Sequence, residues 1–271
     1  ALYSNTTASN NTAVGYQAGF ANTTGGNITA VGRWALKANT TGNDSTAVGL
    51  NALLSNTTGG SNIAVGQQAL QANTTASYNT AVGYQAAYSN TTGADNTAMG
   101  TAALYPNTTG NYNAAFGSAS LRQNTTGSTN TALGQSALNR NTTASNNTAV
   151  GYQAGYSNTT GGANSSVGRG SGYATTTGAN NTSMGYLSLA TNTTAGDNTA
   201  VGFQAGYSRT GSGNTCVGNY SGRDGTSGTD NTFAGRNSGY TITSGSKNTI
   251  IGMYNGNQGN LDIRTRSNHV I

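Results

Sequence analysis

The feature that most constrains this chain is a glycine that returns every 17 residues through almost its whole length. A unit this short has no room for a helical hairpin, and it matches one coil of a β-solenoid, in which stacked copies share a core. We therefore predict an all-β fold, a parallel β-solenoid or β-roll with about 17 residues per coil and roughly fifteen coils. The repeating glycines are Gly15, Gly32, Gly49, Gly66, Gly83, Gly100, Gly117, Gly134, Gly151, Gly168, Gly185 and Gly202, then, after one 16-residue step, Gly218, Gly235 and Gly252.

Two small apolar columns precede this glycine. The adjacent residue is mostly valine, as at Val48, and the residue before it is mostly alanine, as at Ala47. Consecutive strand residues face opposite sides, so we place the larger valine column inside the coil and the alanine column outside it. Small outward residues fit close contact with identical chains around a symmetry axis. The predicted inter-chain contact column is Ala13, Ala30, Ala47, Ala64, Ala81, Ala98, Ala132, Ala149 and Ala200.

Four residues after the glycine stands either a leucine, as at Leu53, or a second glycine followed by an aromatic residue, as at Gly155 and Tyr156. The simplest interpretation is one pocket per coil, filled by the leucine or by the ring. An aromatic ligand-binding stripe is the alternative. The 16-residue step after Gly202 should be absorbed in a turn, leaving later columns in phase.

An Asn-Thr-Thr turn begins seven residues after the glycine, and its stacked amides predict an asparagine ladder. Each triplet is also an N-glycosylation sequon, which leaves glycan attachment as an alternative. The predicted ladder residues are Asn22, Asn39, Asn56, Asn73, Asn90, Asn107, Asn124, Asn141, Asn158 and Asn192.

Side chains that could take part in catalysis or metal binding are few and scattered. Only 6% of residues are charged, and the one histidine, His269, and the one thiol, Cys216, stand far apart in the sequence. The aspartates five residues before a glycine, such as Asp44, are interpreted as turn residues and not as a calcium site. We therefore expect no enzymatic activity, no metal and no cofactor. The net charge of +5 comes without a basic run, so no nucleic acid is expected, although a polyanionic surface remains possible.

The unit N-T-A-V-G-x-x-A, at residues 11–18 and 147–154, resembles the N-S-V-A-I-G-x-x-S/A repeat of trimeric autotransporter adhesin heads. That resemblance implies a left-handed parallel β-roll, packed side by side as a homotrimer. The longer pattern, with Tyr-Gln after the glycine and N-T-T-G in the turn, is closer to repeats of bacteriophage tail fibre proteins. The ending at residues 248–252 and 260–265 resembles the exit from such repeats. We accordingly assign residues 1–252 to the solenoid and 253–271 to an exit segment towards a further C-terminal domain.

The resemblance implies the structural shaft of a tail fibre on a virion, which presents a host-recognition tip. The expected partners are further copies of the chain and a host cell-surface glycan or protein, without membrane insertion. A bacterial surface adhesin whose repeats bind a host or matrix ligand, in an extracellular location, is the first alternative. An ice-binding solenoid using the paired threonines is the second.

Overall fold

The computed structural model describes residues 1–259 and 261–271; residue 260, in the predicted exit segment, lies outside the described residues. The chain is an all-β parallel β-solenoid of about 14 turns with about 17 residues per coil, and no helix occurs among the described residues. This confirms the fold class read from the glycine period. Two compact units are distinguished, Ala1–Ser136 and Ala137–Ile271.

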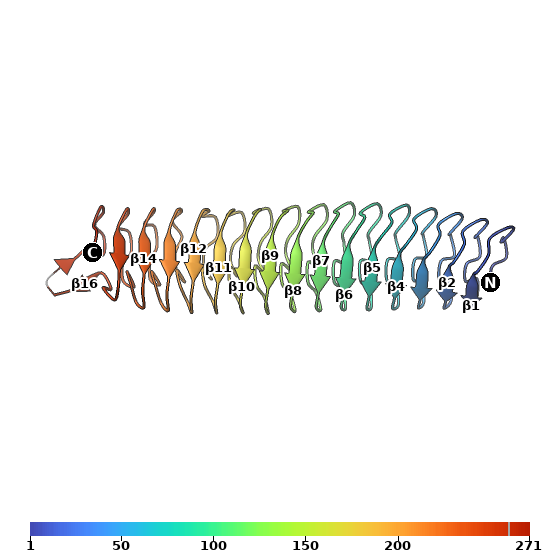
Figure 1. Ribbon diagram of the computed structural model, residues 1–271, viewed down its shortest axis with the longest axis horizontal. Helices are drawn as coiled ribbons and strands as arrows, with labels where there is room; N and C mark the ends of the chain where they lie inside the picture. The colour runs from blue at the N-terminus through green and yellow to red at the C-terminus, as the bar shows by residue number, and fades with distance from the viewer. Residues whose placement is uncertain (260) are drawn as a thin grey trace. The chain divides into compact units, whose positions relative to one another are not determined.

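The first unit contributes one three-residue strand per coil, and successive strands pair in parallel with a constant register, as in Thr46↔Ile63 and Ala47↔Ala64 (Figure 1). The register equals the sequence period, so each column of the repeat becomes a straight row of stacked side chains. Its strands are β1 (Thr12–Val14), β2 (Thr29–Val31), β3 (Thr46–Val48), β4 (Ile63–Val65), β5 (Thr80–Val82), β6 (Thr97–Met99), β7 (Ala114–Phe116) and β8 (Thr131–Leu133).

The second unit repeats this stacking and adds a short hairpin after its last solenoid strand. After the last solenoid strand the chain turns back, and the backbone N–H of Thr249 donates to His269 O at 2.7 Å, so the final residues lie beside that strand. The strands are β9 (Thr148–Val150), β10 (Ser165–Val167), β11 (Thr182–Met184), β12 (Thr199–Val201), β13 (Thr215–Val217), β14 (Thr232–Ala234) and β15 (Thr249–Ile251), followed by the antiparallel pair β16 (Asn257–Gln258) and β17 (Leu261–Asp262).

The repeating glycine is required by the close approach of neighbouring coils. At Gly49 the backbone has φ +138°, and a Cβ there would lie 2.5 Å from Gly66 O in the next coil. An L-residue is strained at that dihedral angle and would also overlap a carbonyl that the stacking holds in place. The strict glycine period therefore reflects the spacing between coils.

The alanine column lies inside the coil, so the predicted inter-chain contact is wrong. The coil is narrow: a Cβ on Gly155 would lie 3.8 Å from Ala149 Cβ on the facing wall, which leaves room for little more than a methyl group. Valine, one residue later, points outward because side chains alternate along a strand. Ala30, Ala47, Ala64, Ala81, Ala98, Ala132, Ala149 and Ala200 are fully buried within their own chain, and Ala13, in the first coil, is half-buried.

The pocket shared by leucine and aromatic rings is also corrected. Leu53 is fully buried, but Tyr156 stays near the surface and stacks on Tyr173, with ring centroids 5.3 Å apart. The interior space beside Gly155 is partly filled by Leu138 of a neighbouring coil, whose Cδ2 would lie 3.0 Å from a Cβ on Gly155. Leucines line the interior, and aromatic rings stack outside it.

The 16-residue step leaves the register intact. Strand β12 pairs with β13 through Thr199↔Thr215, Ala200↔Cys216 and Val201↔Val217. The missing residue is therefore accommodated in the turn between them, as predicted. Val217 is 42% exposed because its whole column faces outward, and this exposure marks no slip in register.

Candidate functional site

The most extensive polar feature of each unit is the asparagine ladder. Asn39 Nδ2 donates to Asn22 Oδ1 of the adjacent coil at 2.8 Å and to Gly42 O of its own turn at 2.9 Å. The same two bonds recur through most of the stack, where each amide closes its own turn and joins two coils. The column holds Asn22, Asn39, Asn56, Asn73, Asn90, Asn107 and Asn124 in the first unit and Asn141, Asn158 and Asn192 in the second, all of them buried.

Burial of the ladder bears on the sequons. The two hydrogens of Asn56 Nδ2 are donated to Asn39 Oδ1 and Gly59 O, each at 2.8 Å, and the side chain is fully buried. A glycan on this nitrogen would replace one of these hydrogens and would have no path to solvent. Glycosylation is thus incompatible with the folded coil at this position, and the turn role explains the Asn-Thr-Thr triplets.

A second row of buried asparagines, four residues before the repeating glycine, was not predicted. The backbone N–H of Asn79 donates to Asn62 Oδ1 at 3.0 Å, and Asn96 Nδ2 donates to Gly110 O at 2.9 Å. Its signal is the first letter of the N-T-A-V-G unit, which recurs as regularly as the valine. The ladder residue Asn107 donates to the same Gly110 O at 2.9 Å, so the two amide rows are neighbours that meet at one turn carbonyl in most coils.

The paired threonines of the turn have different environments. The first of each pair donates its hydroxyl to a carbonyl of the next coil, as Thr40 Oγ1 does to Thr57 O at 3.0 Å. The second, such as Thr58, is exposed. The two hydroxyls therefore do not form one flat outward array, which removes the basis for the ice-binding alternative.

The outward side chains of the strands form a mixed surface, here called the strand face. It consists of the threonine column three residues before the glycine and the apolar column directly before it. Val65 is 36% exposed, Leu133 49% and Met184 42%. Acidic turn residues such as Asp230 precede the strand by two residues, and basic ones such as Arg236 follow the glycine, so the two charges border opposite ends of the strand face.

Aromatic and basic side chains stack next to the strand face in the second unit. Arg169 lies between the rings of Tyr152 and Tyr186, 5.8 and 5.7 Å from their centroids. Tyr186 also stacks on Phe203 at 5.1 Å. These four residues, here called the aromatic row, are all exposed.

The four repeat-column aspartates occupy turns, as predicted. Asp44, Asp95, Asp197 and Asp230 have φ between 54° and 60°, and Asp44 Oδ1 accepts a hydrogen bond from Asn27 Nδ2 at 2.9 Å. Among the described residues, no group of three His, Cys, Asp or Glu side chains is close enough together to hold a metal ion.

Arg209 is a chemically unusual residue that the sequence analysis does not single out, since its charge belongs to no basic run. It occupies the ladder column yet is fully buried, with its guanidinium 5.0 Å from the Phe233 ring and Nη2 donating to Ile242 O at 3.4 Å. Burial lowers the pKa of Arg209 and raises the pKa of the neighbouring Cys216 thiol, which lies in the interior alanine column. A basic residue in a column that is asparagine in most coils is the available signal.

Comparisons with protein-family models and with curated proteins find no match to this chain. In the part of the chain that the structure describes, no helix meets the length and hydropathy needed to cross a bilayer. The function is therefore argued from the surfaces and the stacking.

Proposed function

We propose that this chain is the structural shaft of a fibrous surface appendage, most simply a segment of a phage tail fibre that presents a host-recognition tip. The observation that carries the proposal is the coil-to-coil bonding within each unit, where parallel backbone pairs recur from coil to coil and buried amide rows reinforce most of them. Such bonding resists bending and unwinding along the stack, which is the property a spacer needs. The proposal assigns the chain to the virion and involves no enzymatic activity, cofactor, nucleic acid or membrane insertion.

The same proposal includes a homotrimer, now through the strand face. Apolar side chains that are exposed or half-buried repeat there at every coil, and contiguous patches of this kind mark interaction surfaces. In a cyclic trimer one edge of each strand face meets the opposite edge of the next chain. Asp230 and Arg236, both exposed and at opposite ends of one strand, would then approach across the interface.

The test is the oligomeric state of the intact chain by light scattering. Wild type should be a trimer, and the combined change of Val48, Val65 and Val82 to lysine should give folded monomers because three charges per chain would be desolvated. The matched control places lysine at Thr58, Thr75 and Thr92, which are exposed in the turns of the same unit, and should stay trimeric. A wild-type monomer, or a valine variant that still assembles, would refute this interface.

A bacterial adhesin whose repeats themselves bind a ligand is the second candidate, and the aromatic row favours it. Exposed rings spaced one or two coils apart, with Arg169 between them, could stack on sugar rings of a host glycan. Glycan-array binding that is lost in the Tyr186→Ser variant would support this function. Equal array signals for both proteins would leave the shaft function alone.

A further inference from the structure

The interior of the second unit departs from the repeat in two consecutive coils. Leu138 and Leu189 belong to the buried leucine column, but the two coils between them carry Gly155 and Gly172 at that position. At Gly155, the Leu138 side chain occupies part of the space that a leucine would fill. At Gly172, the nearest atoms to a Cβ would be serine hydroxyl oxygens. The space left by the second leucine is therefore bordered by polar groups.

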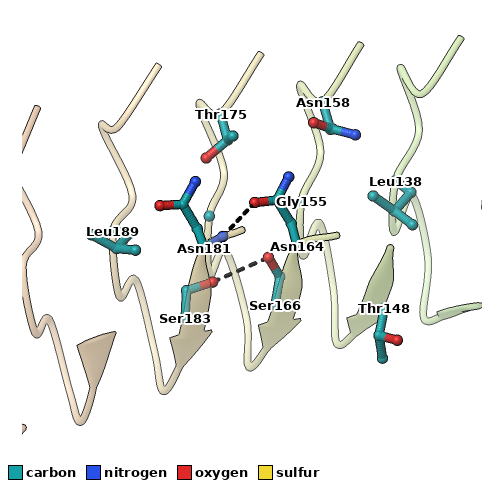
Figure 2. Close-up of a pocket in the computed structure, with 11 residues that line it drawn as sticks. Leu138, Thr148, Gly155, Asn158, Asn164, Ser166, Thr175, Asn181, Ser183 and Leu189 are labelled. Atoms are coloured by element: carbon teal, nitrogen blue, oxygen red, sulfur yellow. Dashed lines mark hydrogen bonds between the residues drawn. The ribbon is translucent and has the colours of Figure 1, made fainter. Parts of the chain in front are cut away.

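These hydroxyls belong to Ser166 and Ser183, which replace alanine in the buried inward column. Their side chains lie on adjacent strands and point to each other, with Ser183 Oγ donating to Ser166 Oγ at 3.1 Å (Figure 2). The column is alanine at Ala149 and again at Ala200, and the two serines between them both border the position of Gly172. Polar side chains and a missing leucine thus coincide beside Gly172.

The asparagine ladder is interrupted at the same place. In an intact stretch each Oδ1 accepts from the amide one coil later, but the residue after Asn158 in the column is Thr175, whose side chain is shorter. Asn158 Nδ2 is held by Asn141 Oδ1 at 2.8 Å and Gly161 O at 2.9 Å, which fixes the orientation of the amide. Its Oδ1 is buried and has no hydrogen-bond partner in the described structure.

A cavity of about 10 Å³ lies between these groups, lined by Asn158, Thr175, Ser166, Ser183 and Gly172 among others (Figure 2). That volume is about what one water molecule requires, and polar cavities of this size hold water whereas apolar ones stay empty. An unbonded buried carbonyl oxygen is costly, and a water that donates to it removes the cost.

We propose that this cavity is a binding site for one internal water molecule, which donates to Asn158 Oδ1. Its remaining bonds are made with the hydroxyls of Thr175, Ser166 and Ser183. The water takes over the role of the missing ladder amide and fills part of the volume left by the missing leucine. This inference is independent of the shaft function, because it concerns the interior of a single chain.

The test is a high-resolution crystal structure of the full chain. We expect a solvent peak within hydrogen-bond distance of Asn158 Oδ1 inside the cavity. Asn56 Oδ1, which accepts from Asn73 Nδ2 at 2.8 Å, is the internal control and should have no such peak. An empty cavity in a well-ordered map, or an Asn158 amide rotated onto another protein group, would overturn the proposal.

The variant Thr175→Asn supplies the missing amide donor. We expect it to displace the water and to raise the midpoint of thermal unfolding by about 2–4 °C, as one recovered buried hydrogen bond predicts for a chain of this size. A solvent peak that persists beside Asn158 in this variant contradicts the assignment. Should the variant fail to fold, the wild-type map still decides the question.

Discussion

Substitution of phenylalanine at Ala81 tests which column of the repeat faces the interior. Ala81 is fully buried, whereas Val82, the next residue, is half-buried on the strand face. The coil is filled on both sides of Ala81 by Leu70 and Ala87, both buried, so a ring there has no space. Overpacking of this kind costs about 1–3 kcal/mol or more. Val82→Phe should be nearly neutral for folding, since the same column already contains Phe116.

The structure also supplies a rescue for this variant. Phe233 occupies the alanine column near the end of the chain, and the corresponding flanking positions there are Gly222 and Gly239, whose Cβ atoms would lie 2.9 and 2.5 Å from the ring. Adding Leu70→Gly and Ala87→Gly to Ala81→Phe should therefore recover part of the lost stability. The measurement is thermal unfolding followed by circular dichroism, in which 1 kcal/mol corresponds to about 2–4 °C. An Ala81→Phe protein with an unchanged unfolding midpoint but altered oligomeric state would refute the interior assignment.

Three further changes have defined expectations. Asn73→Ala removes the donor to Asn56 Oδ1 and should lower the free energy of unfolding by at least about 1–3 kcal/mol in denaturant titration. Arg209→Met removes a buried cation for which no carboxylate partner occurs among the described residues, and should raise that free energy by about 1–4 kcal/mol; a decrease would contradict the argument. Asp262 should titrate by NMR with a pKa of about 2, held low by its hydrogen bonds to Arg264, and Arg264→Gln should return the pKa towards 3.8.

The sign of the Asp262 effect follows from its lowered pKa. The carboxylate form is favoured in the folded chain, so its small contribution to stability is present above the ordinary pKa of 3.8 and is lost as the pH falls towards 2. Asp262 and Arg264 are both exposed, so solvent and salt screen the pair. High salt should therefore move the measured pKa upward.

The period and the turn chemistry could be predicted because each depends on local geometry. A glycine with φ +138°, such as Gly49, and an asparagine that closes its own turn, such as Asn39, each require one residue type. Both therefore leave a clear signal in the sequence. Which face of the strand points into the coil could not be deduced in this way. Alternation shows that Ala47 and Val48 face opposite sides, but only the distance between the coil walls determines which side accepts a methyl group and no more.

The interior of each coil is determined by several columns at once, which explains why single-column arguments failed. A large side chain in the alanine column requires small residues in the leucine column, as Phe233 does with Gly222 and Gly239. The opposite exchange leaves a gap, as at Gly172, where serine hydroxyls then border the space. To assign one column to the interior or to the surface, the residues that face it one coil before and after must therefore be considered. The reason is that the summed volume of the side chains inside a coil can change little. Tyr156, which follows Gly155 in the leucine column, adds no volume to the interior because its ring stacks near the surface on Tyr173.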